Sequence, residues 1–241
     1  FNFDMPEPKE PLLPVKTDPS KFMKAIETCL RSTSIDTSVP DQLGVTLLPD
    51  GKDLLFFATN FTTLSHAFIA LPREVKFGRA IIPSGFCREM IVLADKKVGQ
   101  TFELAKDYAL FQGKDGSTLF GKLVDSPKPV KYLHVFEDFH PEADAKKLGA
   151  IPTKMELILE RACVVAATSV TPIMMEIEVS NRKAKFSTQA QKTEIFDTVE
   201  LDKGQPDVKL RVDPKLVKAG YGTFTKMLLT KKAFIMATDS E

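Results

Sequence analysis

Residues 116–122 read Gly-Ser-Thr-Leu-Phe-Gly-Lys, the start of the glycine-rich loop that holds nucleotide phosphates in many enzymes. The next residue is Leu123, where that loop requires a Ser or Thr hydroxyl to hold magnesium. The loop must also lie between a strand and a helix, so that backbone amides at the helix start face the phosphate. Here the stretch follows a Lys-Asp-Gly turn and is typical of a hairpin strand. The sequence therefore predicts no nucleotide site.

A second cluster of reactive side chains mixes histidines with acids in residues 134–144. It consists of His134, Glu137, Asp138, His140, Glu142 and Asp144. Each of these groups can bind a metal ion, but no helical or Cys-X-X-Cys spacing holds them in one site. We interpret the stretch as a polar loop, with a metal-dependent enzyme as an alternative that elemental analysis would test. The chain also lacks Gly-X-Ser-X-Gly, and we predict no catalytic residue, no metal site and no cofactor.

Eight basic side chains on four predicted helices are candidates for binding an anionic polymer. They are Lys21, Lys24, Arg31, Arg88, Lys154, Arg161, Lys215 and Lys218. On a helix, the first three fall within one arc of about 80°, beside an apolar core face. Cations arranged in this way meet phosphates without base contacts, which gives salt-dependent attraction to DNA of any sequence. Solvated helix faces carry the same residues without any partner, and Glu156 and Glu160 weaken the case for the third helix.

The elements that carry these side chains form a repeat of helix, strands, helix and strands. In the first copy, helices are predicted at 19–31 and 84–94, and strands at 44–48, 54–60, 63–71, 79–83, 101–105, 108–112 and 117–124. In the second copy, helices are predicted at 152–167 and 214–219, and strands at 172–179, 183–189, 193–201, 207–212, 225–230 and 233–238. The sequence therefore predicts an α+β fold of two similar domains, 19–129 and 151–241, with a Pro-rich arm at 1–18 and a connector at 130–150.

Three pairs of segments carry the repeat most clearly. PSKFMKAIETC corresponds to PTKMELILERAC, FFATNFTTLSHAFIAL to KFSTQAQKTEIFDTVEL, and AIIPSGFCREM to LRVDPKLVKAG, at offsets of 129 to 133 residues. With its strand-to-helix junction AIIPSGFCREM and its connector VFEDFHPEAD, the chain resembles the DNA sliding clamp family over residues 19–241. Its features are closest to the bacterial and phage type, from which it departs by having two repeat units where the bacterial type has three.

The resemblance implies duplicated domains with antiparallel sheets outside and two helices each that face the centre of a ring. It implies a processivity factor that encircles double-stranded DNA without sequence specificity and docks a DNA polymerase and a clamp loader. Two-domain members close as trimers, so a homotrimer is implied. The family's apolar cleft for partner peptides corresponds to Tyr132, Leu133, Val135 and Phe136, which alternatively pin the connector to the sheet. The alternative function is a clamp-fold interaction platform that does not encircle DNA.

Composition places the chain among ordinary folded proteins. Its 241 residues, 43% of them hydrophobic, suffice for two cores of about 110 residues each. A net charge of +1 neither requires nor excludes DNA, and no stretch approaches the roughly 18 apolar residues of a membrane span. Three widely spaced cysteines, Cys29, Cys87 and Cys163, predict reduced thiols. These features predict an intracellular protein without a membrane partner. The family resemblance implies the bacterial or phage-infected cytoplasm, and a nuclear location stays open.

Overall fold

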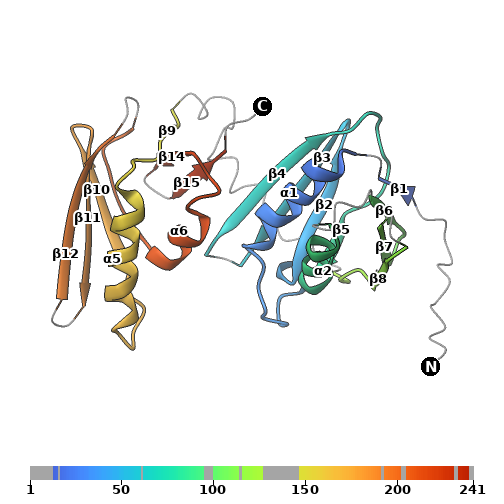
Figure 1. Ribbon diagram of the computed structural model, residues 1–241, viewed down its shortest axis with the longest axis horizontal. Helices are drawn as coiled ribbons and strands as arrows, with labels where there is room; N and C mark the ends of the chain where they lie inside the picture. The colour runs from blue at the N-terminus through green and yellow to red at the C-terminus, as the bar shows by residue number, and fades with distance from the viewer. Residues whose placement is uncertain are drawn as a thin grey trace. The chain divides into compact units, whose positions relative to one another are not determined.

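The computed structural model of the chain describes residues 13–15, 17–60, 62–94, 100–113, 116–126, 147–190, 193–201, 205–230 and 233–238. The chain divides into two compact units, unit 1 with residues 1–130 and unit 2 with residues 131–241 (Figure 1). In each unit the described residues form two antiparallel sheets and two α-helices. The predicted α+β class with antiparallel sheets is confirmed.

Unit 1 contains the helices α1 (Pro19–Leu30) and α2 (Ser84–Ala94), and a short 3-10 helix, Pro40–Gln42, that precedes the first long strand. The larger sheet has the order β4-β3-β2-β5, formed by β2 (Gly44–Asp50), β3 (Asp53–Thr59), β4 (Leu64–Ala70) and β5 (Ala80–Pro83). The smaller sheet has the order β1-β6-β7-β8, formed by β1 (Leu13–Pro14), β6 (Gln100–Leu104), β7 (Tyr108–Gly113) and β8 (Thr118–Lys122). Both helices pack on the larger sheet, and α2 also contacts β7 and β8.

Helix α1 forms where the sequence supplies both a start signal and a core-facing stripe. The side chain of Asp18 accepts two backbone N–H hydrogen bonds from the first turn, at 2.8 and 3.3 Å, and Pro19 opens the helix. Phe22 lies edge-on to Phe56 of β3, with 5.3 Å between ring centroids, and 4.9 Å from the ring of Phe102 on β6. One buried ring therefore joins α1 to both sheets of unit 1, and its burial contributes about 2 kcal/mol.

Unit 2 repeats this plan with the helices α5 (Met155–Ala167) and α6 (Pro214–Gly220). Its larger sheet has the order β12-β11-β10-β13, formed by β10 (Met175–Ser180), β11 (Lys183–Ala190), β12 (Thr193–Glu200) and β13 (Val208–Val212). Its smaller sheet has the order β15-β14-β9, formed by β9 (Gly149–Ala150), β14 (Lys226–Leu229) and β15 (Phe234–Ala237). Helix α5 packs on β11 and β12 and beside α6 (Figure 1).

The two larger sheets share one strand register. In unit 1, Leu47 of β2 is opposite Phe56 of β3 and Ala80 of β5. The residues 130 positions later pair in the same way, Ile177 with Phe186 and Leu210. All six side chains are buried. The repeat that the sequence predicts therefore extends to the individual residue pairs of the cores.

Two segments predicted to lie outside the domains end inside sheets. Leu13–Pro14 pairs with β6 as β1, and the N–H of the buried Val15 donates to the carbonyl of Phe102 at 2.9 Å. The prediction of an arm without a core element is therefore wrong for residues 13–15, because one apolar side chain in a Pro-rich stretch suffices to fill a site in the core. At the end of the predicted connector, β9 pairs with β14. Residues 1–12 and 127–146 lie outside the described residues.

Two predicted boundaries differ from the structure by three residues. The helix expected from 152 begins at Met155, because residues 152–154 form a turn in which the Met155 N–H donates to the Pro152 carbonyl at 2.9 Å. Lys154 is consequently the residue before the helix rather than part of it. The strand expected from 172 begins at Met175, opposite the last residue of β13.

Candidate nucleic-acid interface

Helix α1 presents its predicted basic residues to solvent. Lys21, Lys24 and Arg31 are exposed, and the opposite side of the helix is buried in the core. Arg31, the residue after the helix, lies 3.5 Å from the carboxylate of Glu27, an exposed pair that contributes less than about 1 kcal/mol. Within the described part of the chain, no carboxylate lies within 4.0 Å of the Lys21 or Lys24 ammonium group. These two lysines are therefore available to an external anion.

The start of α1 has a charge arrangement that helix stability alone does not favour. Its first turn has no acidic residue, although Lys21 lies there and a cation at a helix N-terminus is unfavourable by about 0.3–1 kcal/mol. Helix α6 repeats the arrangement, because Asp213 accepts the N–H of Lys215 at 2.8 Å and Pro214 opens the helix. In both helices the capping carboxylate is bound to backbone amides, and the lysine that follows it is exposed. Both helices therefore begin with a capping carboxylate followed by an exposed lysine.

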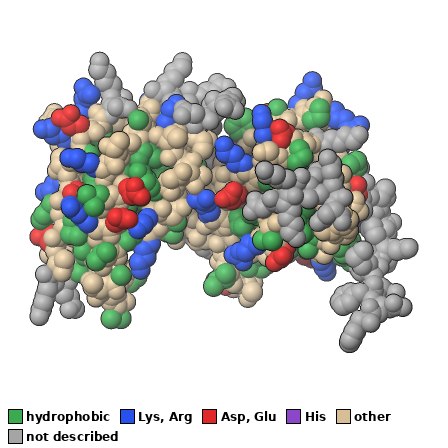
Figure 2. All heavy atoms as spheres, in the orientation of Figure 1, with side chains coloured by type: hydrophobic (Ala, Val, Ile, Leu, Met, Phe, Trp, Pro, Cys, Tyr) green, Lys and Arg blue, Asp and Glu red, His purple; other side chains and the backbone are tan. Residues whose placement is uncertain are grey.

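Two of the four predicted cations of unit 2 are bound to acids of their own unit. The Arg161 guanidinium lies 3.2 Å from Asp197 of β12, and the Lys218 ammonium lies 3.8 Å from Glu160 of α5. Lys154 and Lys215 are exposed. Over the helices of unit 2, Figure 2 shows basic, acidic and hydrophobic side chains interspersed. The net attraction of this surface for phosphate is consequently weaker than the count of its lysines and arginines predicts.

The solvent side of α5 carries two aliphatic residues that the sequence reading did not single out. Leu157 is 48% exposed and Val164 is 65% exposed. Because they are seven residues apart, they lie on one line of the helix, opposite the buried stripe. Lys154 and Arg161 are also seven residues apart, so the same spacing in the sequence could have identified Leu157 and Val164.

The seam between α5 and α6 contains a thiol close to the α6 lysines. Burial raises the pKa of Cys163, and the nearby Lys218 and Lys215 ammonium groups act in the opposite direction. Cys29 and Cys87 are free and buried in unit 1, where burial raises the pKa of Cys87 to about 12. None of the three thiols is therefore an activated nucleophile.

Helix α2 contributes one predicted cation. Arg88 is exposed, while Phe86, Cys87 and Met90 on the other side of α2 are buried. The exposed Glu89 follows directly and reduces the net charge of this face. Taken over unit 1, Lys21 and Lys24 form the stronger basic feature.

Of the residues considered for binding phosphate, metal or partner peptides, only those of 116–122 lie within the described part of the chain. Residues 118–122 form the strand β8, which pairs with β7 as the predicted hairpin strand does. Tyr132, Leu133, Val135, Phe136 and the acidic, histidine-containing cluster of 134–144 lie outside the described residues. In the described part of the chain, no group of three or more His, Cys, Asp or Glu side chains is arranged to hold a metal ion. No described helix is long and apolar enough to cross a membrane.

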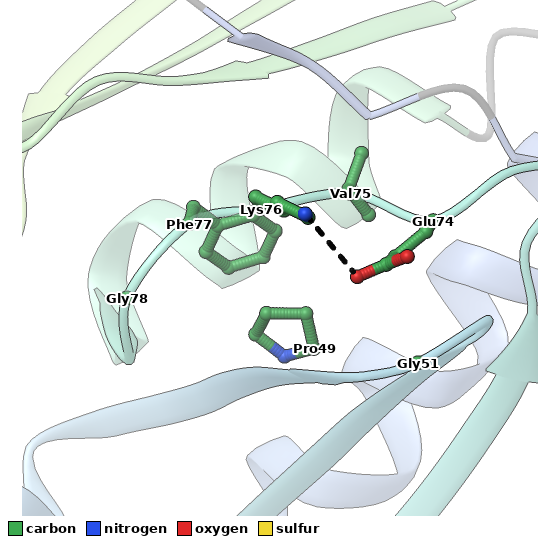
Figure 3. A pocket seen from close by; sticks show the side chains of 7 residues that line it. All are labelled: Pro49, Gly51, Glu74, Val75, Lys76, Phe77 and Gly78. Carbon is green, nitrogen blue, oxygen red and sulfur yellow. Dashed lines mark ion pairs between the residues drawn. The ribbon is translucent and has the colours of Figure 1, made fainter.

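An open recess of about 500 Å³ lies on unit 1, and none of the residues that line it belongs to α1. Its lining residues, drawn in Figure 3, come from the end of β2, the turn after it and the loop before β5: Pro49, Gly51, Glu74, Val75, Lys76, Phe77 and Gly78. The Lys76 ammonium is 4.0 Å from the carboxylate of Glu74, which belongs to the same loop.

Comparison with solved structures identifies the fold. The chain matches a DNA polymerase III beta subunit from Thermotoga maritima with a TM-score of 0.82 and 14% identity, covering 100% of this chain and 65% of that one. It matches the DNA polymerase III subunit beta of Pseudomonas aeruginosa with a TM-score of 0.82 and 15% identity, covering 100% and 67%. For a DNA polymerase sliding clamp from Caulobacter crescentus the values are 0.80 and 14%, covering 100% and 65%.

These matches establish that the chain has the sliding-clamp fold along its whole length. The chain spans about two thirds of the length of the bacterial proteins it matches. No protein-family model matches the sequence, and no curated protein matches it either.

Proposed function

We propose that this chain is a sliding clamp, a processivity factor that encircles double-stranded DNA and tethers a DNA polymerase to it. The observation that carries the proposal is the match of the entire chain to DNA polymerase III beta subunits at TM-scores near 0.8. The exposed lysines at the starts of α1 and α6 supply the charge for holding DNA. Contacts to phosphate alone suit a protein that must move along DNA, because they carry no sequence information.

The proposed ring is a homotrimer joined head to tail. Two units per chain and three chains give six units, the number that the family resemblance implies. Sheet edges hold unpaired backbone groups, and pairing edges between copies would satisfy them. Light scattering should give a mass of three chains of 26.8 kDa, about 80 kDa, independent of concentration over a wide range. A persistent monomer would favour the interaction platform.

The partners we propose are a DNA polymerase and a clamp loader, and no chemical step belongs to the chain itself. The ring acts by confinement, which replaces repeated encounters with DNA by a high effective concentration of the docked polymerase. The predicted docking residues for partner peptides are Tyr132, Leu133, Val135 and Phe136. The protein would act where the cell, or the phage that infects it, replicates its DNA.

The decisive experiment reverses the charge of the four lysines of α1 and α6. We expect the variant with Lys21, Lys24, Lys215 and Lys218 changed to Glu to bind duplex DNA about 100-fold more weakly at low salt, with a shallower salt dependence. The matched control changes four exposed lysines of the turns and strands to Glu: Lys52, Lys106, Lys122 and Lys183. Fluorescence anisotropy against salt concentration measures both.

The control carries the same change in total charge but leaves the helices intact. An equal loss of DNA affinity in both variants would mean that only net charge matters, which contradicts encirclement by the helices. Unchanged DNA affinity in the helix variant, with the trimer mass retained, would favour the platform that does not encircle DNA. The circular dichroism spectrum of each variant verifies folding before the comparison is made.

A further inference from the structure

The first helix of each unit has the same buried stripe but a different solvent face. Phe22, Ile26 and Cys29 of α1 are buried, and so are the residues 133 positions later in α5, which are Met155, Leu159 and Ala162. The same offset takes Lys21 to Lys154, Lys24 to Leu157 and Arg31 to Val164. The helices therefore dock alike on their sheets, and two cationic positions of α1 are aliphatic in α5.

The remaining cation on the solvent side of α5 is held by an acid that unit 1 lacks. Arg161 takes the place of Thr28, and its partner Asp197 on β12 takes the place of Ala67 on β4. One oxygen of Asp197 is buried without a hydrogen-bond partner among the described residues, so the Arg161 guanidinium is its main source of compensation. Arg161 is thus fixed by a partly buried carboxylate instead of being available to phosphate.

We infer that the clamp holds DNA unequally. The lysines of α1 attract phosphate groups, whereas the Leu157 and Val164 stripe of α5 faces the DNA without attracting phosphate. This inference rests on the proposed function. Each lysine or arginine that neutralises a phosphate adds about 0.9 to the slope of log affinity against log salt, whereas an aliphatic contact adds nothing. A channel that is only partly cationic binds less tightly, and DNA moves along it with fewer ion pairs to break.

Duplex DNA is the occupant that the surroundings of the stripe favour. Lys154 is exposed at the head of the same helix, in the place of Lys21 of unit 1, and Lys215 is exposed at the start of the neighbouring α6. The aliphatic residues are therefore continuous with the proposed phosphate-contacting surface.

The experiment adds charge to the stripe. In the assembled full-length protein, the double variant Leu157→Lys, Val164→Lys should raise the salt slope of DNA binding by about 1.8 and raise affinity at low salt about tenfold. Its diffusion along DNA, followed on single molecules, should slow. The matched control adds two lysines to the exposed face of β11 and β12, with Gln189→Lys and Thr198→Lys, and should change neither slope nor diffusion.

A second variant guards against a folding defect in the first. Asp197→Asn keeps the shape of the side chain but removes the charge that holds Arg161, and it should raise the salt slope by about 0.9. A slope equal to that of the control in both variants would overturn the inference, because α5 would then not face DNA. Loss of polymerase binding in the double variant, with DNA binding unchanged, would also overturn it and assign the stripe to a protein partner.

The outcome can be separated from that of the proposed function itself. Lys21→Ala with Lys24→Ala should lower DNA affinity and the salt slope if the chain is a clamp of any kind. If this removal weakens DNA binding while the added lysines on α5 have no effect, the clamp function stands and the unequal division fails. If neither change affects DNA binding, the proposed function fails as well.

Discussion

The larger sheets of the two units differ on the face that points away from the helices, although their strands pair alike. Thr46, Phe57 and Ile81 lie on this face in unit 1, alternate with the core residues and are buried. Their counterparts 130 positions later in unit 2 are Glu176, Ser187 and Arg211. There, Glu176 accepts hydrogen bonds from Lys209 at 2.7 Å and from Arg211 at 3.1 Å.

The difference indicates which positions the repeat constrains. The matched core positions that face the helices, Leu47, Phe56 and Ala80 in unit 1 and Ile177, Phe186 and Leu210 in unit 2, are apolar in both units, because the helices remove them from water. The three matched positions on the opposite face are buried in unit 1, where two of them are apolar, and they are polar or charged in unit 2, where they are half-buried or exposed. One strand register therefore supports a covered face in one unit and a solvated face in the other.

The largest effect is expected at equivalent positions of the two cores. Phe56→Ala and Phe186→Ala should each lower the free energy of unfolding of their unit by about 3–5 kcal/mol, because each leaves a cavity between helix and sheet. Denaturant unfolding followed by circular dichroism measures the loss. Costs that differ by more than about 2 kcal/mol between the two variants would contradict the equivalence of the cores.

Exchanging the matched residues Ile81 and Arg211, on the sheet faces that point away from the helices, should destabilise the two units unequally. Ile81 is 2% exposed, so Ile81→Arg should cost about 2–4 kcal/mol by burying an unpaired charge. The Arg211 side chain is 73% exposed, so Arg211→Ile should cost less than about 1 kcal/mol. Thermal unfolding of both variants gives the comparison. Similar costs for the two substitutions would mean that the faces are not differently covered.

The sequence was sufficient for the elements and for the core faces, since both follow from local periodicity. The strand predicted at 108–112 is β7, and the residues predicted for the core side of α1, such as Phe22 and Ile26, are buried. Which acid meets which base depends instead on tertiary structure. The ion pair between Asp41 and Arg79, at 3.1 Å, joins residues far apart in the chain, and the same is true of Asp197 and Arg161. For this reason Arg161 was predicted as free to bind DNA.

The smallest effect concerns the ion pairs on the exposed face of unit 2. Hydrogen bonds from Lys209 and Arg211 hold the pKa of Glu176 below its ordinary value of 4.5. Because the pKa is lower in the folded state than in the unfolded state, the ionised carboxylate stabilises the fold at neutral pH. This contribution is lost as the pH falls below 4.5 and through the lowered pKa of the folded state. Glu176→Gln should therefore be slightly less stable than the parent at pH 7, and the difference should vanish in acid. Glu200→Gln, which changes an exposed acid on β12, is the control.

The two edge strands of the smaller sheet of unit 1, β1 and β8, differ in their backbone donors. Pro14 of β1 is opposite Glu103 of β6 and has no N–H with which to bind a further strand. At Pro14 this edge therefore lacks a donor that a further strand would need. The strand at the opposite edge of this sheet is β8, which contains no proline. A strand from another molecule therefore finds a complete row of backbone donors along β8 but not along β1.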